Sequence, residues 1–273
     1  MKTIVLLAAA VGRLLAFQDE QTKQTRTFSG VNLVILDNVN GSIEATGYSG
    51  NDLHVEAVRT IRAESAERLE AAEREVKLDM QQSSTTVKLY VDGPFRCNCR
   101  DGGWHGHQGY SVNYDFKLEV PAAARLDLYT VNDGVIVVRN VEGDFDIGNV
   151  NGRIELTGMA GSGKAHTVNG PVKAMFVKNP AAATTFETVN GSLDLTFRPG
   201  LNADVHMKTM NGGMYTDFNV QRLPLAPESP ERQNGRYVLR RGGATGVRIG
   251  AGGIEMNLKT LNGDIFIRDR ERQ

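Results

Sequence analysis

The stretch "VNGRIELTGMAGSGKAHTVNGPVKAMFVKNPAAATTFETVNGSLDLTF", residues 150–197, contains three copies of Val-Asn-Gly, spaced 18 and 21 residues apart. In each copy, apolar residues stand three and five positions after the asparagine. This spacing of two places both side chains on one face of a β-strand. A period of this length is typical of a stacked, repetitive architecture. The segment therefore predicts a unit of strand, corner and strand that recurs along the chain.

The same unit extends over most of the sequence. It is centred on seven asparagines, namely Asn40, Asn132, Asn151, Asn169, Asn190, Asn211 and Asn262. The residue before each asparagine is apolar, and the residue two positions before it is threonine in five of the seven copies. After Asn132, the apolar positions of the pattern fall on Val135 and Val137. Because Asn and Gly tolerate positive φ, we expect both to occupy the sharp corners. Stacked corners would also let each asparagine bond its neighbour in a ladder.

Two all-β folds fit this repeat. If each Asn-Gly is the corner of a coil, the chain is a parallel β-solenoid, similar to a β-helix, whose successive rungs of about 20 residues stack in parallel. If each is a two-residue hairpin turn, the chain is an antiparallel β meander or sandwich. The aligned side chains recur at the full period, whereas the intervening turns at 142–144 and 159–161 do not resemble the Asn-Gly corners. The pattern therefore favours the solenoid.

The rest of the sequence predicts a single domain, residues 28–270, behind a signal peptide at 1–17. The N-terminal segment has Lys2, an apolar stretch and then small residues, with cleavage expected near Ala16. Within the domain, an amphipathic helix is expected near 63–78, with Ser65 as its N-cap. Two loop insertions are expected, one at 93–110 and a Pro-rich one at 221–235.

Composition limits the partners. The formal net charge of the 273 residues is −1, so there is no large basic field to hold nucleic acid. No later segment is apolar for long enough to cross a bilayer, so no transmembrane span is expected in the mature chain. With the signal peptide, these features predict an extracytoplasmic protein in the periplasm, in the cell envelope or secreted.

The first insertion contains the candidate ligands for a metal ion, in "CNCRDGGWHGHQGY". These are Cys97, Cys99, His105 and His107. Thiolates and imidazoles are suitable ligands for zinc or copper(I), although the spacing is not that of a zinc finger. A disulfide between Cys97 and Cys99 is the rival interpretation, and an uncommitted loop is the third. No other cofactor is predicted.

Polysaccharide-acting enzymes with β-helix folds need clustered carboxylates on adjacent rungs. The outward position, four residues after the asparagine, includes Ile136 in one copy and reads Glu155, Lys173 and Asp194 on three successive rungs. Alternating charge of this kind indicates ion pairing on a solvated face. No catalytic residue is predicted, and the chain is expected not to be an enzyme.

The segments "VPAAARLDLYTVNDGVIVVRNVEGDFDIGNVNGRIELTG", "TVNGSLDLTF" and "LKTLNGDIFIRD" resemble the bacterial "putative adhesin" family, a domain of unknown function similar to the auto-transporter adhesin head (GIN) domain. The resemblance covers roughly 28–268 and implies a secreted or envelope-associated β-solenoid, with adhesion proposed by analogy.

The expected function is therefore a non-catalytic structural or binding protein of the cell envelope, similar to an adhesin. Its partner would be a polysaccharide, an envelope protein or another copy of itself. The alternatives are a metal-binding envelope protein that uses the Cys/His loop and, third, a polysaccharide-acting β-helix enzyme.

Overall fold

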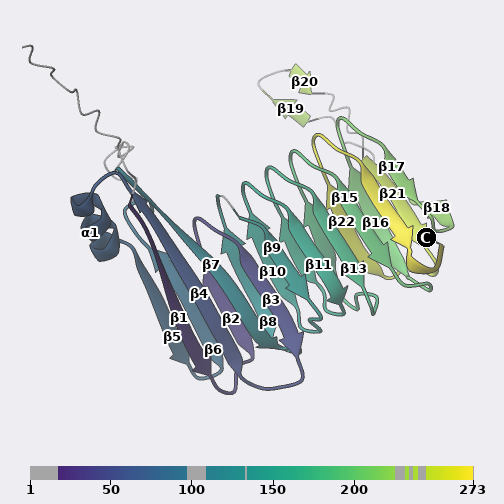
Figure 1. Cartoon of the computed structure of the whole chain (residues 1–273). Coiled ribbons are helices and arrows are strands. Elements are labelled where there is room, and N and C mark those ends of the chain that lie inside the picture. The colour runs from purple at the N-terminus through teal and green to yellow at the C-terminus, as the bar shows by residue number, and fades with distance from the viewer. Residues whose placement is uncertain are drawn as a thin grey trace, which may run out of the picture.

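The computed structural model describes residues 18–96, 109–132, 134–224, 231–233, 236–238 and 244–272. Within these residues the chain is mostly β-structure with one short α-helix. Two mixed sheets face each other across a continuous apolar core and do not close into a barrel (Figure 1). The predicted all-β class is confirmed.

The described residues form ten strands in sheet A and eleven in sheet B. In spatial order, sheet A consists of β1 (Gln18–Phe28), β4 (Leu53–Ala63), β7 (Tyr110–Pro121), β3 (Ile43–Tyr48), β9 (Ile136–Arg139), β11 (Ile154–Met159), β13 (Val172–Phe176), β15 (Leu193–Phe197), β23 (Ile265–Asp269) and β17 (Met214–Thr216). Sheet B consists of β18 (Val220–Arg222), β21 (Ala244–Ile249), β16 (Ala203–Lys208), β22 (Ile254–Lys259), β14 (Thr184–Glu187), β12 (Gly163–His166), β10 (Phe145–Asn149), β8 (Arg125–Thr130), β2 (Leu33–Asp37), β6 (Thr86–Asp92) and β5 (Lys77–Ser83). The remaining elements are α1 (Ala66–Glu75), the hairpin of β19 (Glu231–Gln233) and β20 (Arg236–Val238), and the 3₁₀ turn η1 (Arg270–Arg272).

In the middle of the stack, the chain alternates between the two sheets, and each strand pairs in parallel with its equivalent one repeat away. On sheet A, Ile154 lies opposite Val172, and Val172 lies opposite Leu193. All three side chains are fully buried, because alternate residues of each strand face the space between the sheets. Antiparallel pairing occurs at the two ends of the stack and in the β19/β20 hairpin. The end pairs are β1 with β4, β4 with β7, β5 with β6, β16 with β21 and β18 with β21. Two facing sheets also agree with the sandwich-like alternative.

The corner asparagines form the predicted ladder. Each donates a hydrogen bond from its Nδ2 to Oδ1 of the next asparagine in one uniform direction. The pairs are Asn211 to Asn262 (2.7 Å), Asn262 to Asn190 (2.7 Å), Asn190 to Asn169 (2.8 Å), Asn169 to Asn151 (2.8 Å), Asn151 to Asn132 (2.8 Å) and Asn132 to Asn40 (3.3 Å). Asn40 in turn donates to the carbonyl of Val112 at 3.2 Å. The ladder thus ties seven corners together along one edge of the stack.

The expectation that these asparagines adopt positive φ is wrong. In the described part of the chain, the non-glycine residues with positive φ are Ser84 and Asn140. The glycine after the asparagine takes that conformation at some corners, with φ of 112° at Gly41 and 157° at Gly263. The asparagine is therefore used for its side-chain amide and not for its backbone freedom.

The recurrent threonines form a second, inner row of bonds. Each of the five donates from its hydroxyl to the carbonyl of a corner glycine on the neighbouring coil, at 2.8–3.0 Å; the donors are Thr130, Thr167, Thr188, Thr209 and Thr260. In the other two copies the donor is an asparagine amide, from Asn38 to Gly41 (3.2 Å) and from Asn149 to Gly134 (3.1 Å). Because buried carbonyls need a donor, this row explains the sequence preference two positions before each corner.

We expect Asn190→Ala to lower the free energy of unfolding by about 1–2 kcal/mol, since the side chain makes two ladder bonds, each with a net value of about 0.5–1.5 kcal/mol. Urea denaturation measures the change. Asn219→Ala is the matched control, because Asn219 is exposed and its side chain bonds nothing in the part of the chain that the structure describes. Equal midpoints for the two variants would contradict a stabilising ladder.

One repeat is shifted by a residue relative to the sequence alignment. The sequence has one residue more between Asn132 and Gly134 than the other copies have between asparagine and glycine, and Ile136 lies opposite Ile43 on one side and Ile154 on the other. Ile136 and Val138 therefore face the core, instead of Val135 and Val137. The prediction that Ile136 faces outward is also wrong, since it is fully buried.

The coils do not stack in chain order at the C-terminal end. The coil around Asn262 lies between those of Asn190 and Asn211, so β23 separates β15 from β17, and β22 separates β14 from β16. In Figure 1 the yellow C-terminal strands accordingly lie among green ones. Seven similar repeats can pair with one another equally well, so the period alone does not determine which coils are neighbours.

The predicted boundaries need three corrections. First, β1 begins at Gln18, and all 11 of its residues pair with β4, so the folded part starts before residue 28. Second, the helix is shorter than 63–78, because β4 ends at Ala63 and β5 begins at Lys77; the Ser65 cap is confirmed by its bond from the Arg68 amide at 3.3 Å. Third, the 221–235 insertion is not entirely loop, since β19 pairs with β20. The predicted signal peptide lies outside the described residues.

Candidate binding groove

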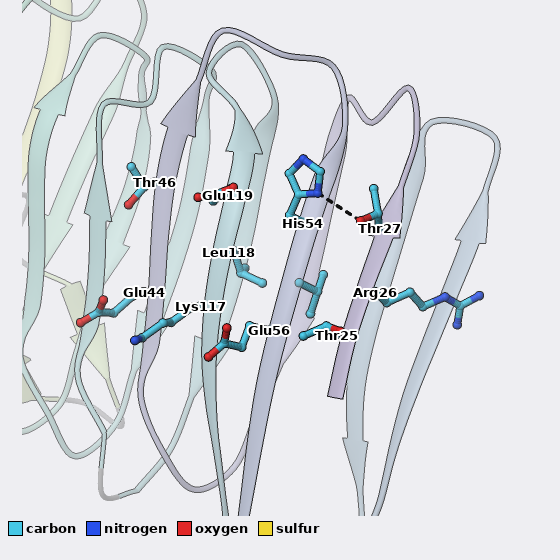
Figure 2. Close-up of a pocket in the computed structure, with 11 residues that line it drawn as sticks. Thr25, Arg26, Thr27, Glu44, Thr46, His54, Glu56, Lys117, Leu118 and Glu119 are labelled. Atoms are coloured by element: carbon cyan, nitrogen blue, oxygen red, sulfur yellow. Dashed lines mark hydrogen bonds between the residues drawn. The ribbon is translucent and has the colours of Figure 1, made fainter. Parts of the chain in front are cut away.

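A groove of about 660 Å³, lined mainly by polar side chains, crosses the outer face of sheet A over β1, β4, β7 and β3 (Figure 2). It is lined by Thr25, Arg26, Thr27, Glu44, Thr46, His54, Val55, Glu56, Lys117, Leu118 and Glu119. The four strands are paired in register, so side chains from distant parts of the sequence form rows across the groove. Two of the 11 lining residues, Val55 and Leu118, have aliphatic side chains, and both are buried in the core.

The first row carries alternating charge. Glu56 lies opposite Lys117, and Lys117 lies opposite Glu44. The carboxylate of Glu56 is 2.8 Å from the ammonium of Lys23, and this hydrogen bond lowers the pKa of Glu56. Glu44 lies 3.9 Å from the guanidinium of Arg139. Each of the two carboxylates therefore lies beside a cationic side chain.

The second row consists of hydroxyl groups, an imidazole and a carboxylate. Thr27 lies opposite His54, His54 opposite Glu119, and Glu119 opposite Thr46. His54 lies within hydrogen-bonding distance of two hydroxyls, with Nδ1 at 3.1 Å from Thr27 Oγ1 and Nε2 at 3.4 Å from the Tyr48 oxygen. The ring is thus fixed in orientation between two neutral partners.

Two charged side chains in the groove remain available to a ligand. Lys117 and Glu119 extend from the same face of β7, two residues apart (Figure 2). Within the described residues, neither side chain makes a hydrogen bond or an ion pair. Their neighbours Glu44 and Glu56 already have cationic partners, so Lys117 and Glu119 are the groups that a bound molecule would engage.

The Thr27–His54 contact is the arrangement in the groove that comes closest to a nucleophile and its base. Activation of a hydroxyl requires the far side of the imidazole to be oriented by a third group, commonly a carboxylate, and a pair of donors for the developing oxyanion. Here the far nitrogen faces the Tyr48 hydroxyl, and the amides of β1, β4 and β7 are used in the sheet. The geometry fits binding better than acyl transfer.

On the outer face of sheet B, Tyr129 and His166 lean toward each other across Gly148, with ring centroids 6.2 Å apart. Burial, with a hydrogen bond to Asp146, raises the pKa of Tyr129 to about 12. Burial, with the nearby Lys164, lowers the pKa of His166. Both rings are therefore neutral at pH 7, and they cover a glycine in a central strand, which is a packing role.

The metal ligands predicted from the sequence, Cys97, Cys99, His105 and His107, lie outside the described residues. Among the residues that are described, no group of three or more His, Cys, Asp or Glu side chains could hold a metal ion. The metal site, the rival disulfide and the choice of zinc or copper stay predictions.

The predicted charge row on the repeat face is present in register, with Glu155 opposite Lys173 and Lys173 opposite Asp194. The ion pairs nevertheless run elsewhere. Glu155 bonds Arg153 at 2.7 Å, and Asp194 bonds Arg268 at 2.7 Å. The row is thus a solvated surface in which each carboxylate has a cationic partner. The groove was not predicted from the sequence, because three of its four strands, β1, β4 and β7, lie outside the repeat.

No family model matches the chain, and no curated protein matches it either. Among solved structures, it is similar to a putative cell adhesion protein from Clostridium sporogenes ATCC 15579, with 10% identity over 92% of this chain and 100% of that one and a TM-score of 0.45. It is also similar to putative adhesins from Parabacteroides merdae ATCC 43184 (10% identity, 92% and 96% of the two chains, TM-score 0.32) and Bacteroides fragilis NCTC 9343 (9%, 91% and 97%, 0.27). Likeness at this level does not establish a shared fold or function.

Across the described residues, no helix is long and apolar enough to cross a membrane.

Proposed function

We propose that the protein is a non-catalytic binding element of the cell envelope, adhesin-like and extracytoplasmic, that holds a polysaccharide chain in the groove on sheet A. The observation that carries this proposal is the open groove across four strands, lined mainly by polar side chains, in which Lys117 and Glu119 make no hydrogen bond or ion pair among the described residues. Hydroxyls of Thr25, Thr27 and Thr46 line the same surface and suit a polyhydroxylated ligand.

The scaffold for this role is, in our proposal, a β-solenoid with modified ends. Its support is the parallel pairing of equivalent strands in the middle of the stack, together with the two rows of corner bonds. Such a stack is stiff and elongated, because each coil contacts only its neighbours. It would present the groove at one end of a rigid body.

The charge of the groove restricts the class of polysaccharide. Glu44, Glu56 and Glu119 outnumber the single lysine that extends into it. Like charges across an interface lower affinity, so a neutral or amino-sugar chain should bind better than a polyuronate. The carboxylates would accept bonds from sugar hydroxyls, and Lys117 would donate to ring or carbonyl oxygens.

The test is isothermal titration of the purified protein with a neutral glucan, an amino-sugar polymer and a polyuronate of equal length. Lys117→Ala should weaken binding of the preferred polymer at least about tenfold, which corresponds to roughly 1.4 kcal/mol. Lys173→Ala is the matched control, because Lys173 is an exposed lysine on the same outer face but away from the groove. Polymer length is measured before and after incubation.

Three results would contradict the proposal. Wild-type protein that binds none of the polymers rules out the ligand class, and equal weakening by Lys117→Ala and Lys173→Ala rules out the groove. Shortened polymer rules out the non-catalytic role.

A further inference from the structure

The coil formed by β22 and β23, residues 254–269, is a wedge between two coils that precede it in the sequence. On sheet B, β22 pairs in parallel with both β14 and β16; on sheet A, β23 pairs in parallel with both β15 and β17. We call these residues the wedge coil. The position it fills, between the β14/β15 coil and the β16/β17 coil, is called the slot.

Both walls of the slot bind the wedge coil through the same corner chemistry. Toward one wall, Asn262 donates to Asn190 Oδ1 at 2.7 Å and Thr260 donates to the carbonyl of Gly191 at 2.9 Å. Toward the other wall, Asn211 donates to Asn262 Oδ1 at 2.7 Å and Thr209 donates to the carbonyl of Gly263 at 3.0 Å. The slot is therefore shaped for one repeat unit and specifies its register on both sides.

The β14/β15 wall and the β16 strand of the other wall are also held independently of the wedge coil, whereas β17 pairs with β23 alone among the described strands. The β14/β15 coil pairs with the β12/β13 coil, and β16 pairs with β21 on its far side. The β21 strand precedes the wedge coil in the chain, so the connection between them must pass over β16. This connection is Gly250-Ala251-Gly252-Gly253, and all three glycines have positive φ, at 58°, 73° and 128°.

A short glycine-rich connection of this kind can serve as a hinge, since glycine adopts alternative φ values at little cost. A segment that leaves its slot about a hinge can enter the equivalent slot of another copy, where it makes every contact again. In the exchanged form only the hinge conformation changes. The contacts of the wedge coil thus favour neither form over the other, and protein concentration sets the balance.

We propose that the wedge coil is exchanged between two copies of this chain, so that residues 254–269 of each copy fill the slot of the other. The partner that the slot recognises is a second copy, because its two walls demand the Thr-x-Asn-Gly corner and the inward apolar residues of this repeat. The resulting dimer joins two stacks at the end opposite the groove, so exchange and polysaccharide binding are independent.

The competing outcome for an opened slot is closure. The β16/β17 coil carries the same corner as the wedge coil and could pair directly with the β14/β15 coil, which would exclude any wedge. A cross-linking experiment separates exchange from closure and from simple side-by-side association.

The experiment uses full-length chains in which Cys97 and Cys99 are replaced by serine. One chain carries Thr185→Cys, and a second, differently tagged chain carries Asn257→Cys; Thr185 lies opposite Asn257 across β14 and β22. In the control mixture, a chain with Lys164→Cys replaces the Asn257→Cys chain and is mixed with the Thr185→Cys chain. Lys164 lies opposite Thr185 on its other side, on a coil that does not exchange. Pairs of chains are mixed at high concentration, warmed to just below their unfolding temperature, cooled, and treated with a short thiol-specific cross-linker.

Exchange predicts a product of twice the monomer mass from the Thr185→Cys and Asn257→Cys mixture, in a yield that rises with protein concentration, and none from the Lys164→Cys mixture. A single chain with both Thr185→Cys and Asn257→Cys shows that the reagent spans the pair. The proposal is overturned if that chain cross-links internally while the mixture gives no dimer, because each wedge coil then stays in its own slot. It is also overturned if, after warming, neither the single chain nor the mixture cross-links, which is the result that closure predicts. It is equally overturned if both mixtures give the dimer, which indicates association without exchange.

Discussion

Phe186→Ala should lower the free energy of unfolding by about 3–5 kcal/mol, the range for removal of a fully buried phenylalanine. Phe186 on β14 is fully buried and lies between two other aromatic rings of the core. Its ring centroid is 6.4 Å from that of Phe145 on the same sheet and 6.3 Å from that of Phe176 on the opposite sheet. The truncation would leave a cavity between the sheets that neither rigid coil can fill.

Denaturant unfolding, followed by far-ultraviolet circular dichroism, measures this change. Tyr215→Ala is the control, since the Tyr215 side chain is 54% exposed on the outer face of sheet A. Surface substitutions generally change the free energy of unfolding by no more than about 0.5 kcal/mol. Because the Tyr215 ring also stacks on Phe266, its removal should lower the free energy of unfolding by somewhat more than that. If the two variants unfold at the same denaturant concentration, the space between the sheets is not the core described above.

Gly191→Ala should lower the free energy of unfolding by about 1–3 kcal/mol, the usual cost of overpacking. A methyl group at this corner would overlap the carbonyl oxygen of Gly170 on the neighbouring coil and lie 2.5 Å from its carbonyl carbon. The obstacle is backbone, which cannot rotate away as a side chain can. Two coils would have to separate, and the Thr188 hydroxyl bond to Gly170 would lengthen with them.

Gly200→Asn is the matched control for this effect. A side chain there would meet nothing within 4 Å, and asparagine tolerates its φ of 79° better than most residues. The unfolding midpoint of Gly200→Asn should therefore stay close to that of the wild type, while that of Gly191→Ala falls. A Gly191→Ala variant as stable as the control would mean that the coils are not in the close contact described.

The middle of the fold was predictable because its information is local. Each repeat carries its own corner and its own inward residues, so the strands, their faces and the asparagine ladder follow from alignment. The alignment does not determine which coils are neighbours, because Asn190 can accept a hydrogen bond from Asn262 as readily as from Asn211. The register shift at Ile136 was missed for a related reason: one extra residue in the sequence between Asn132 and Gly134 preserves the apolar pattern and moves its register by one residue.

The ends and the groove depended on long-range pairing. Strand β1, "QDEQTKQTRTF", is polar on both faces and has no strand period, and only its antiparallel pairing with β4 orders it. Lys117 and Glu119 alternate with apolar residues as in any half-solvated strand. They become part of a site only because β7 lies between β4 and β3, both of which are distant from β7 in the sequence.

The asparagine ladder has a polarity, because all its amides donate in the same sense from Asn211 toward Asn40. A chain of aligned amides polarises its members, so each bond strengthens the next, and one amide cannot reverse without breaking its neighbours' bonds. The two ends of the ladder consequently differ. At one end, Asn40 already donates a hydrogen bond to the Val112 carbonyl, whereas at the other end Asn211 Oδ1 accepts no hydrogen bond within the described residues. Any molecule that extends the ladder must supply a hydrogen-bond donor to Asn211 Oδ1, so the ladder can be extended at its Asn211 end only.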